Sequence, residues 1–186
     1  MTTFTIHTAA TAPDAAKPLL AGVQSKFGFV PNLMGTLADA PSVLKAMLDL
    51  GAAVGATSLT PAEQQLVMIT TSRLNGCSYC VAAHSTMSHM AKLPEGVIAA
   101  ARTGTPLADA KLEALRQFTE TVVKTQGWAP DTAVPKFLAA GYTKANVLEV
   151  VLAVTYKVLT NYVNHMAETP LDAAFSGQKI DLKRAS

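Results

Sequence analysis

Residues 59–84 read LTPAEQQLVMITTSRLNGCSYCVAAH and contain the start of one helix, its end and the start of the next. Thr60–Glu63 has the pattern of a capping box with proline at the first helical position, which predicts that a helix begins there. Leu66–Leu74 continues this helix. Asn75–Gly76 is a natural stop, because glycine readily takes the left-handed conformation after a helix end. We therefore expect the next helix to begin near Cys77.

The only two cysteines of the 186-residue chain lie in this stretch as Cys77 and Cys80, and His84 follows one helical turn later. On a helix, this spacing puts all three side chains on one face. Thiols in the first turn meet the positive end of the helix dipole and unpaired backbone N–H groups, which favour the thiolate. This argument makes Cys77 the more acidic thiol and places Cys80 better to share a proton with His84.

Three interpretations of the cluster are open on the residues alone. A redox dithiol needs two sulfurs within bonding reach, an acidic thiolate and a proton acceptor, and the motif supplies all three. A zinc site would use two thiolates and an imidazole, but a structural zinc needs a fourth ligand, and the chain has no second CxxC or HxxxH pair. The third is plain core packing of small apolar cysteines. The shared helical face favours the redox dithiol.

Composition restricts the class of protein. Apolar residues make up 49% of the chain and charged residues only 15%, which is typical of a chain that hides part of its surface in a homo-oligomer. The formal net charge is +2 and the basic residues are scattered, so we expect no nucleic-acid partner.

The ends and apolar runs of the chain bear on its location. The N-terminus lacks the cationic start and apolar core of a secretion signal, and the apolar run Val147–Val154 is too short to cross a bilayer. We expect a cytoplasmic protein with no membrane partner. In a reducing compartment a CxxC is more typical of redox or metal chemistry than of a permanent bridge.

Nearly every other segment has a helical pattern, and no sustained period-two alternation indicates a strand. We predict one all-α domain over residues 1–186, a helical bundle with the CxxC at the N-terminal end of a central helix. Residues 1–30 are expected to form an irregular arm with an extended elbow at Phe27–Asn32, and residues 173–186 a loose tail. The expected helices cover residues 41–54, 61–74, 77–91, 94–104, 108–125, 132–140 and 143–169.

Four segments together resemble the alkylhydroperoxidase AhpD-like branch of the carboxymuconolactone decarboxylase superfamily. They are Leu59–His84, Gly28–Asn32, Ala140–Tyr142 and Asn161–Met166, so the likeness extends over most of the chain. The resemblance implies an all-α fold, assembly into dimers, trimers or hexamers, and reduction of hydroperoxides through a CxxC disulfide. It implies an external dithiol, a protein or a small thiol, as reductant, and no cofactor.

In the family the second cysteine attacks the peroxide and the first resolves the sulfenic acid into a disulfide, roles that fall here to Cys80 and Cys77. This disagrees with the dipole argument for Cys77. A helix-start effect is worth about 0.3–1 kcal/mol, which proximity to His84 and access to the peroxide can outweigh. We therefore expect Cys80 to attack.

Two positions depart from the family pattern. The family's proton-relay glutamate lies twelve residues before the first cysteine, where this chain has Gln65. Glutamine can hold an imidazole or a water, but it cannot carry a proton near neutral pH. Tyr79 replaces a histidine of the best-known members, and its phenol can donate a hydrogen bond to a thiolate or to peroxide. We expect a slower or differently tuned peroxidase.

The remaining charged candidates carry weaker signals. Glu63 lies about 200° round the helix from Gln65, and its capping role explains it. His89 lies about 140° round the helix from His84, so we expect it at the surface or in packing. His7 carries no signal.

Three polar residues follow the apolar part of the last helix. Asn161, Asn164 and His165 lie near its expected end, where polar groups commonly satisfy the last carbonyls. We expect that role, with a share in the active site as the alternative.

Other functions are open beside the peroxidase. A decarboxylase or lactone enzyme is suggested by the superfamily name, but members of that branch are expected to lack the CxxC. A redox sensor or a zinc-stabilised scaffold would use the cysteines without turnover.

Overall fold

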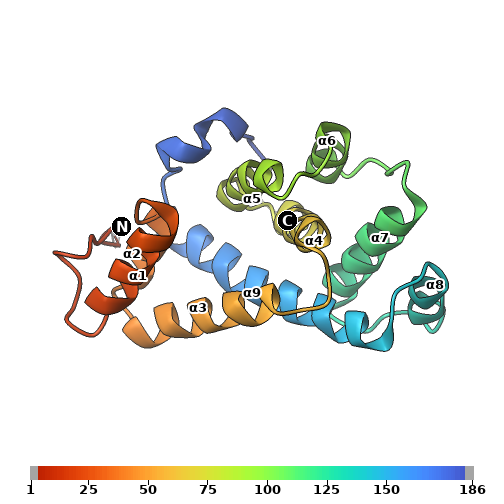
Figure 1. The fold of residues 1–186 in the computed structure, drawn as a ribbon, viewed down its shortest axis with the longest axis horizontal. Helices are drawn as coiled ribbons and strands as arrows, with labels where there is room; N and C mark the ends of the chain where they lie inside the picture. The colour runs from red at the N-terminus through yellow and green to blue at the C-terminus, as the bar shows by residue number, and fades with distance from the viewer. Residues whose placement is uncertain (1–3, 183–186) are drawn as a thin grey trace.

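The computed structural model of the chain describes residues 4–182, and every regular element in this range is a helix. The all-α prediction is thereby confirmed. Figure 1 shows α4 end-on near the centre, with α5 and α6 above it, α7 to the right and α9 running below. The elements are α1 (Lys17–Phe27), α2 (Asn32–Leu37), α3 (Pro41–Gly55), α4 (Pro61–Leu74), α5 (Ser78–Met90), α6 (Glu95–Thr103), α7 (Ala110–Thr125), α8 (Ala133–Ala139), α9 (Lys144–Ala167) and the 3-10 helix η1 (Ala173–Gln178).

The turn between α4 and α5 is built as the sequence predicts. Thr60 and Glu63 close the capping box, with Thr60 N–H donating to Glu63 Oε2 at 2.9 Å and Glu63 N–H donating to Thr60 Oγ1 at 3.2 Å. Gly76 has φ +70°, and Cys77 N–H returns to the carbonyl of Ser72 at 2.9 Å. Cys77 is therefore the N-cap of α5, directly before its first turn.

The N-terminal region is more regular than we expected. The prediction of an irregular arm over residues 1–30 is wrong for Lys17–Phe27, which forms α1 with Leu20 and Val23 buried on one face. Gly28 ends this helix in the left-handed conformation at φ +80°. The elbow is extended only around residues 30–31, and the short helix α2 follows it without having been predicted. Residues 1–3 lie outside the described part.

The C-terminal segment is also ordered against the body of the protein. The prediction of a loose tail is wrong for η1, because Phe175 is buried between the rings of Phe29 and Tyr79, at centroid distances of 6.0 and 6.1 Å. Asp172, just before η1, accepts hydrogen bonds from Tyr79 Oη at 2.6 Å and from the N–H of Asn32 at 3.0 Å. Residues 183–186 lie outside the described part.

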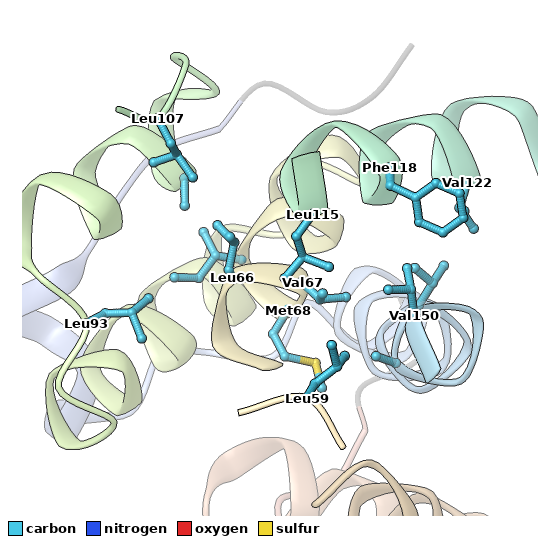
Figure 2. Close-up of a cluster of buried hydrophobic side chains, with 14 of the residues drawn as sticks. Leu59, Leu66, Val67, Met68, Leu93, Leu107, Leu115, Phe118, Val122 and Val150 are labelled. Carbon is cyan, nitrogen blue, oxygen red and sulfur yellow. The ribbon is translucent and has the colours of Figure 1, made fainter. Parts of the chain in front are cut away.

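Two clusters of buried side chains fill the interior. The first, shown in Figure 2, brings together side chains of α4, α7 and α9, among them Leu66, Leu115 and Val150. The second joins α1, α2, α3 and α5 and contains both cysteines. Tyr156 of α9 packs against both clusters. The thiols therefore lie inside the protein rather than on a surface loop.

Within residues 4–182, no single helix combines the length and apolarity needed to cross a membrane; only α8 and α9 taken together do so, and they are bent by 115°.

Candidate active site

The two thiols are buried beside the C-terminal half of α9. Cys77 and Cys80 are each 2% exposed and are free thiols. The amide of Asn164 donates to Cys80 Sγ at 3.2 Å and lies 3.9 Å from Cys77 Sγ. Because α5 begins at Ser78, Cys80 sits in its first turn, with its sulfur facing α9.

A buried lysine lies next to His84. Lys157 on α9 is 2% exposed, and its Nζ lies 2.9 Å from Nε2 of His84. In the described part of the chain no carboxylate comes within 4.0 Å of this amine. A buried ammonium without a carboxylate is costly unless another anion balances it.

The partners of His84 fix where its proton lies. Nδ1 is 2.9 Å from Oε1 of Gln65, and an amide oxygen can only accept, so we assign the proton to Nδ1. Nε2 then accepts from the Lys157 ammonium. Burial and the Lys157 charge hold the pKa of His84 well below its ordinary value, so the imidazole is neutral at pH 7. Gln65 orients the imidazole, one of the two roles expected for a glutamine there.

The two thiols differ in acidity. Burial raises the pKa of Cys80, but the hydrogen bond from Cys77, the charge of Lys157 and the amides of Asn161 and Asn164 outweigh it. The pKa of Cys80 is therefore below its ordinary value. The pKa of Cys77 is raised, because Cys77 keeps its proton in the hydrogen bond to Cys80 and is itself buried. The dipole argument, which made Cys77 more acidic, is wrong because the hydrogen bond from Cys77 and the charge of Lys157 favour the thiolate at Cys80.

Tyr79 points away from the sulfurs. Its hydroxyl donates to Asp172 at 2.6 Å and accepts from the N–H of Leu33 at 3.4 Å. Burial and the Asp172 carboxylate raise the pKa of Tyr79. The phenol therefore ties α5 to α2 and to the C-terminal segment, and the hydrogen bond that we expected it to give a thiolate goes to Asp172.

The other predicted candidates lie elsewhere. Glu63 serves the capping box and also accepts from Tyr142 Oη at 2.9 Å. His89 is partly exposed near Glu95, as expected, and His7 contacts Asp39.

The asparagines of α9 belong to the site. We expected Asn161 and Asn164 to satisfy the helix end, and this is wrong for their side chains. Asn164 reaches the thiols, and Asn161 connects Ser72 and Asn75 at the end of α4. His165 is exposed at the rim of an adjoining cleft.

The sequence analysis missed Lys157, although a signal was present. The buried positions of α9 include Val150, Val154, Lys157, Asn161 and Asn164, which recur at helical spacing on one stripe. This stripe changes from apolar to polar halfway along the helix. A lysine on the apolar face of a core helix is rare unless it has a partner, and this pattern could have identified it.

A metal ion has no ready set of ligands in the described range. No group of three His, Cys, Asp or Glu side chains converges within residues 4–182. Both ring nitrogens of His84 are engaged by Gln65 and Lys157. An ammonium at this position disfavours a divalent cation.

Comparison with known proteins agrees with this fold. The model of the carboxymuconolactone decarboxylase family matches residues 41–121, from the start of α3 through most of α7. Among solved structures, an AhpD-core, peroxidase-related protein from Ralstonia eutropha JMP134 is similar with a TM-score of 0.83 and 21% identity, over 94% of this chain and 96% of the other. A peroxidase-related protein from Silicibacter sp. TM1040 gives 0.78 and 19%, over 89% of each chain.

A further neighbour carries a different name. The debrominase Bmp8, in complex with 2,3,4-tribromopyrrole, is similar with a TM-score of 0.81 and 16% identity over 96% of each chain. No curated protein matches the sequence. The family match covers the central helices, and these solved structures share the all-helical fold of the chain.

Proposed function

We propose that the protein is a thiol-dependent peroxidase that reduces hydrogen peroxide or small organic hydroperoxides through a Cys77–Cys80 disulfide. The observation that carries this proposal is the buried Lys157 side chain, which has no carboxylate within 4.0 Å among residues 4–182 and whose charge favours the Cys80 thiolate. A buried cation favours the anionic form of a neighbouring acid. Cys80 is then a thiolate near neutral pH, and the thiolate is the nucleophilic form.

The chemistry needs no further redox group. The Cys80 thiolate attacks the terminal oxygen of ROOH, the O–O bond breaks, and the alkoxide takes a proton to leave as ROH. Water can supply that proton. The Cys77 thiol then attacks the sulfur of the Cys80 sulfenic acid. A disulfide forms, and water leaves with the hydroxyl of Cys80 and the proton of Cys77.

Gln65 and His84 have a positioning role in this scheme. The neutral imidazole accepts from Lys157, and Gln65 keeps its proton on the opposite nitrogen. Since an amide cannot carry a proton, no relay continues beyond His84. This supports a peroxidase tuned differently from members with a glutamate at this position.

Reductive dehalogenation is a second candidate function, because one similar structure is named a debrominase. A thiolate with a resolving thiol also supplies the two electrons that replacement of a halogen by hydrogen requires. The acidic Cys80 beside Cys77 favours it as much as peroxide reduction. A redox sensor would share the first oxidation but would not turn over.

We also propose that the protein acts as a homo-oligomer in the cytoplasm, with no nucleic-acid partner. Exposed apolar side chains on α9 support the oligomer: Leu148, Val151, Tyr162 and Met166 are 71%, 43%, 56% and 77% exposed. Light scattering of the purified protein measures its mass in solution.

The first experiment treats the reduced protein with one equivalent of cumene hydroperoxide, alkylates remaining thiols and determines the mass of the peptide with Cys77 and Cys80. Rapid formation of an intramolecular disulfide is expected, and Cys80→Ser should abolish oxidation. Cys77→Ser is the matched control, because it should stop at the sulfenic acid. Thiols left unmodified by peroxide would contradict the proposal.

Two further measurements test the other candidate functions. A brominated pyrrole in place of the peroxide tests for dehalogenation. Turnover with excess dithiothreitol distinguishes an enzyme from a redox sensor.

A further inference from the structure

A cleft of about 720 Å³ adjoins Cys77. One wall is the turn into α5, from Asn75 to Tyr79, and the other is the end of α9, including Tyr162, Asn164 and His165. Among the described residues its lining is about equally polar and apolar.

The two cysteines relate differently to this cleft. Cys77, the N-cap of α5, lines it, although only 2% of this residue is exposed. Cys80 and His84 do not line it. Cys80 lies one turn further along α5, where the amide of Asn164 is 3.2 Å from its sulfur. A molecule entering the cleft therefore meets Cys77 first.

The groups around the two sulfurs also make them unequal as leaving groups. In thiol–disulfide exchange, the sulfur that leaves most readily is the one whose thiolate is best stabilised. Here that sulfur is Cys80, which has the amide of Asn164 and the charge of Lys157. Access and leaving-group stability thus select the same direction of attack.

We propose that a dithiol reductant enters through this cleft and attacks Sγ of Cys77 in the oxidised protein, which rests on the proposed disulfide cycle. The reductant thiolate forms a bond to Cys77, the Cys77–Cys80 bond breaks, and its electron pair leaves on Cys80. The second thiol of the reductant then attacks its own sulfur in the mixed disulfide. The reductant departs as a disulfide, and Cys77 takes up the proton released from that thiol.

The stabilised Cys80 thiolate also favours a dithiol over a monothiol as the reductant. After the first step the Cys80 thiolate remains beside Cys77 and can attack it again, expelling a monothiol and restoring the disulfide. A second thiol on the same reductant competes with this reversal at a high effective concentration. A monothiol lacks that advantage and regenerates the protein slowly.

The test starts from protein oxidised with diamide, so that it does not depend on a reaction with peroxide. Oxidised protein is mixed with excess 2-mercaptoethanol, denatured in acid with N-ethylmaleimide, and the peptide holding both cysteines is sequenced by mass spectrometry. We expect mercaptoethanol on Cys77 and the maleimide on Cys80. Mercaptoethanol on Cys80 overturns the proposal.

Two variants test entry through the cleft by the rate at which the oxidised protein is reduced. His165→Trp fills the rim of the cleft, whereas Met166→Trp adds the same ring at the next residue, which does not line it. Reduction of the diamide-oxidised protein by dithiothreitol should slow about tenfold in His165→Trp, because exchange depends on access, and should be unchanged in Met166→Trp. Equal rates in the two variants overturn the proposal. A protein that passes both tests but ignores peroxide would refute only the peroxidase.

Discussion

Two buried cations in this protein differ in how their positive charge is balanced. Arg116 of α7 is 6% exposed and is held by Glu113, at 2.6 Å, and by Glu120, which also pairs with Arg73. Lys157 of α9 is 2% exposed; its amine contacts the neutral imidazole of His84, and its charge lowers the pKa of Cys80. The first charge is balanced by carboxylates. The second has no carboxylate within 4.0 Å among the described residues, and ionisation of a thiol would balance it.

The difference separates a structural charge from a chemical one. Carboxylates are ionised at neutral pH in any case, so the Arg116 network holds helices together without changing which groups carry protons. The acidity of the Glu113 carboxyl reflects this: hydrogen bonds from Arg116 lower its pKa to about 2. A thiol is ordinarily protonated, so Lys157 changes the chemical state of its neighbour.

The largest effect should come from removing the balanced cation. Arg116→Met leaves the partly buried Glu113 without its cationic partner and Glu120 with only Arg73 and Lys124, and breaking a buried pair typically destabilises a protein by about 3–5 kcal/mol. Urea denaturation measures the change. Lys124→Met, which removes an exposed partner of Glu120, is the control and should have little effect. A small loss in Arg116→Met would mean that the network is dispensable.

Removing the unbalanced cation should affect reactivity more than stability. In Lys157→Met, Cys80 can take back its proton, so no buried charge remains and the unfolding free energy should fall less than in Arg116→Met. The pKa of Cys80 should rise, and oxidation by cumene hydroperoxide at pH 7 should slow by about 100-fold. The loss should shrink as pH increases, because the thiolate then forms without help. Stopped-flow measurements from pH 5 to about pH 9 test this.

Lys144→Met, at the exposed start of the same helix, is the control for Lys157→Met. It should leave the pH profile of oxidation unchanged. The account of Lys157 fails if Lys157→Met oxidises at the normal rate at pH 7.

A smaller effect should follow from placing a carboxylate at the far side of His84. Gln65→Glu restores a group that can carry a proton, and the oxidation rate should rise up to about tenfold. Gln64→Glu, one residue earlier and bonded to the carbonyl of Leu59, is the control. A fall in rate would show instead that the new carboxylate compensates Lys157 and weakens its action on Cys80.

The smallest effect should come from the phenol of the motif. Tyr79→Phe removes the hydrogen bond to Asp172, and a buried hydrogen bond typically contributes about 0.5–1.5 kcal/mol. Oxidation of the thiols should hardly change, because this hydroxyl points away from them. A large drop in the oxidation rate with normal stability would return Tyr79 to the reacting groups.

The sequence predicts the central helices well and the ends poorly. Capping boxes, the stop at Gly76 and the apolar spacing of α4, α7 and α9 are local signals, and local signals locate helices. The segments containing α1 and η1 are short and depend on a few long-range contacts. Phe175 packs between aromatic rings that are distant in sequence, and no local sequence pattern predicts these contacts.

The site shows the same division. The positions of Cys77, Cys80 and His84 on one helix follow from spacing alone, and the family pattern added Gln65. Lys157 lies far along the chain and reaches His84 only through the packing of α9 against the site. The relative acidity of the cysteines depends on that packing, so an argument limited to the helix start selected the wrong sulfur.

The long sequence separation between the cysteine motif and Lys157 has a consequence for biosynthesis. Cys77 and Cys80 leave the ribosome about eighty residues before Lys157, and later still comes Asp172, whose bond to Tyr79 spans 93 residues. Domains are synthesised from the N-terminus at a limited rate, so the nascent chain carries two ordinary thiols while about eighty further residues are added. The acidic thiolate arises only when the last helix docks, and a truncated chain would not acquire it.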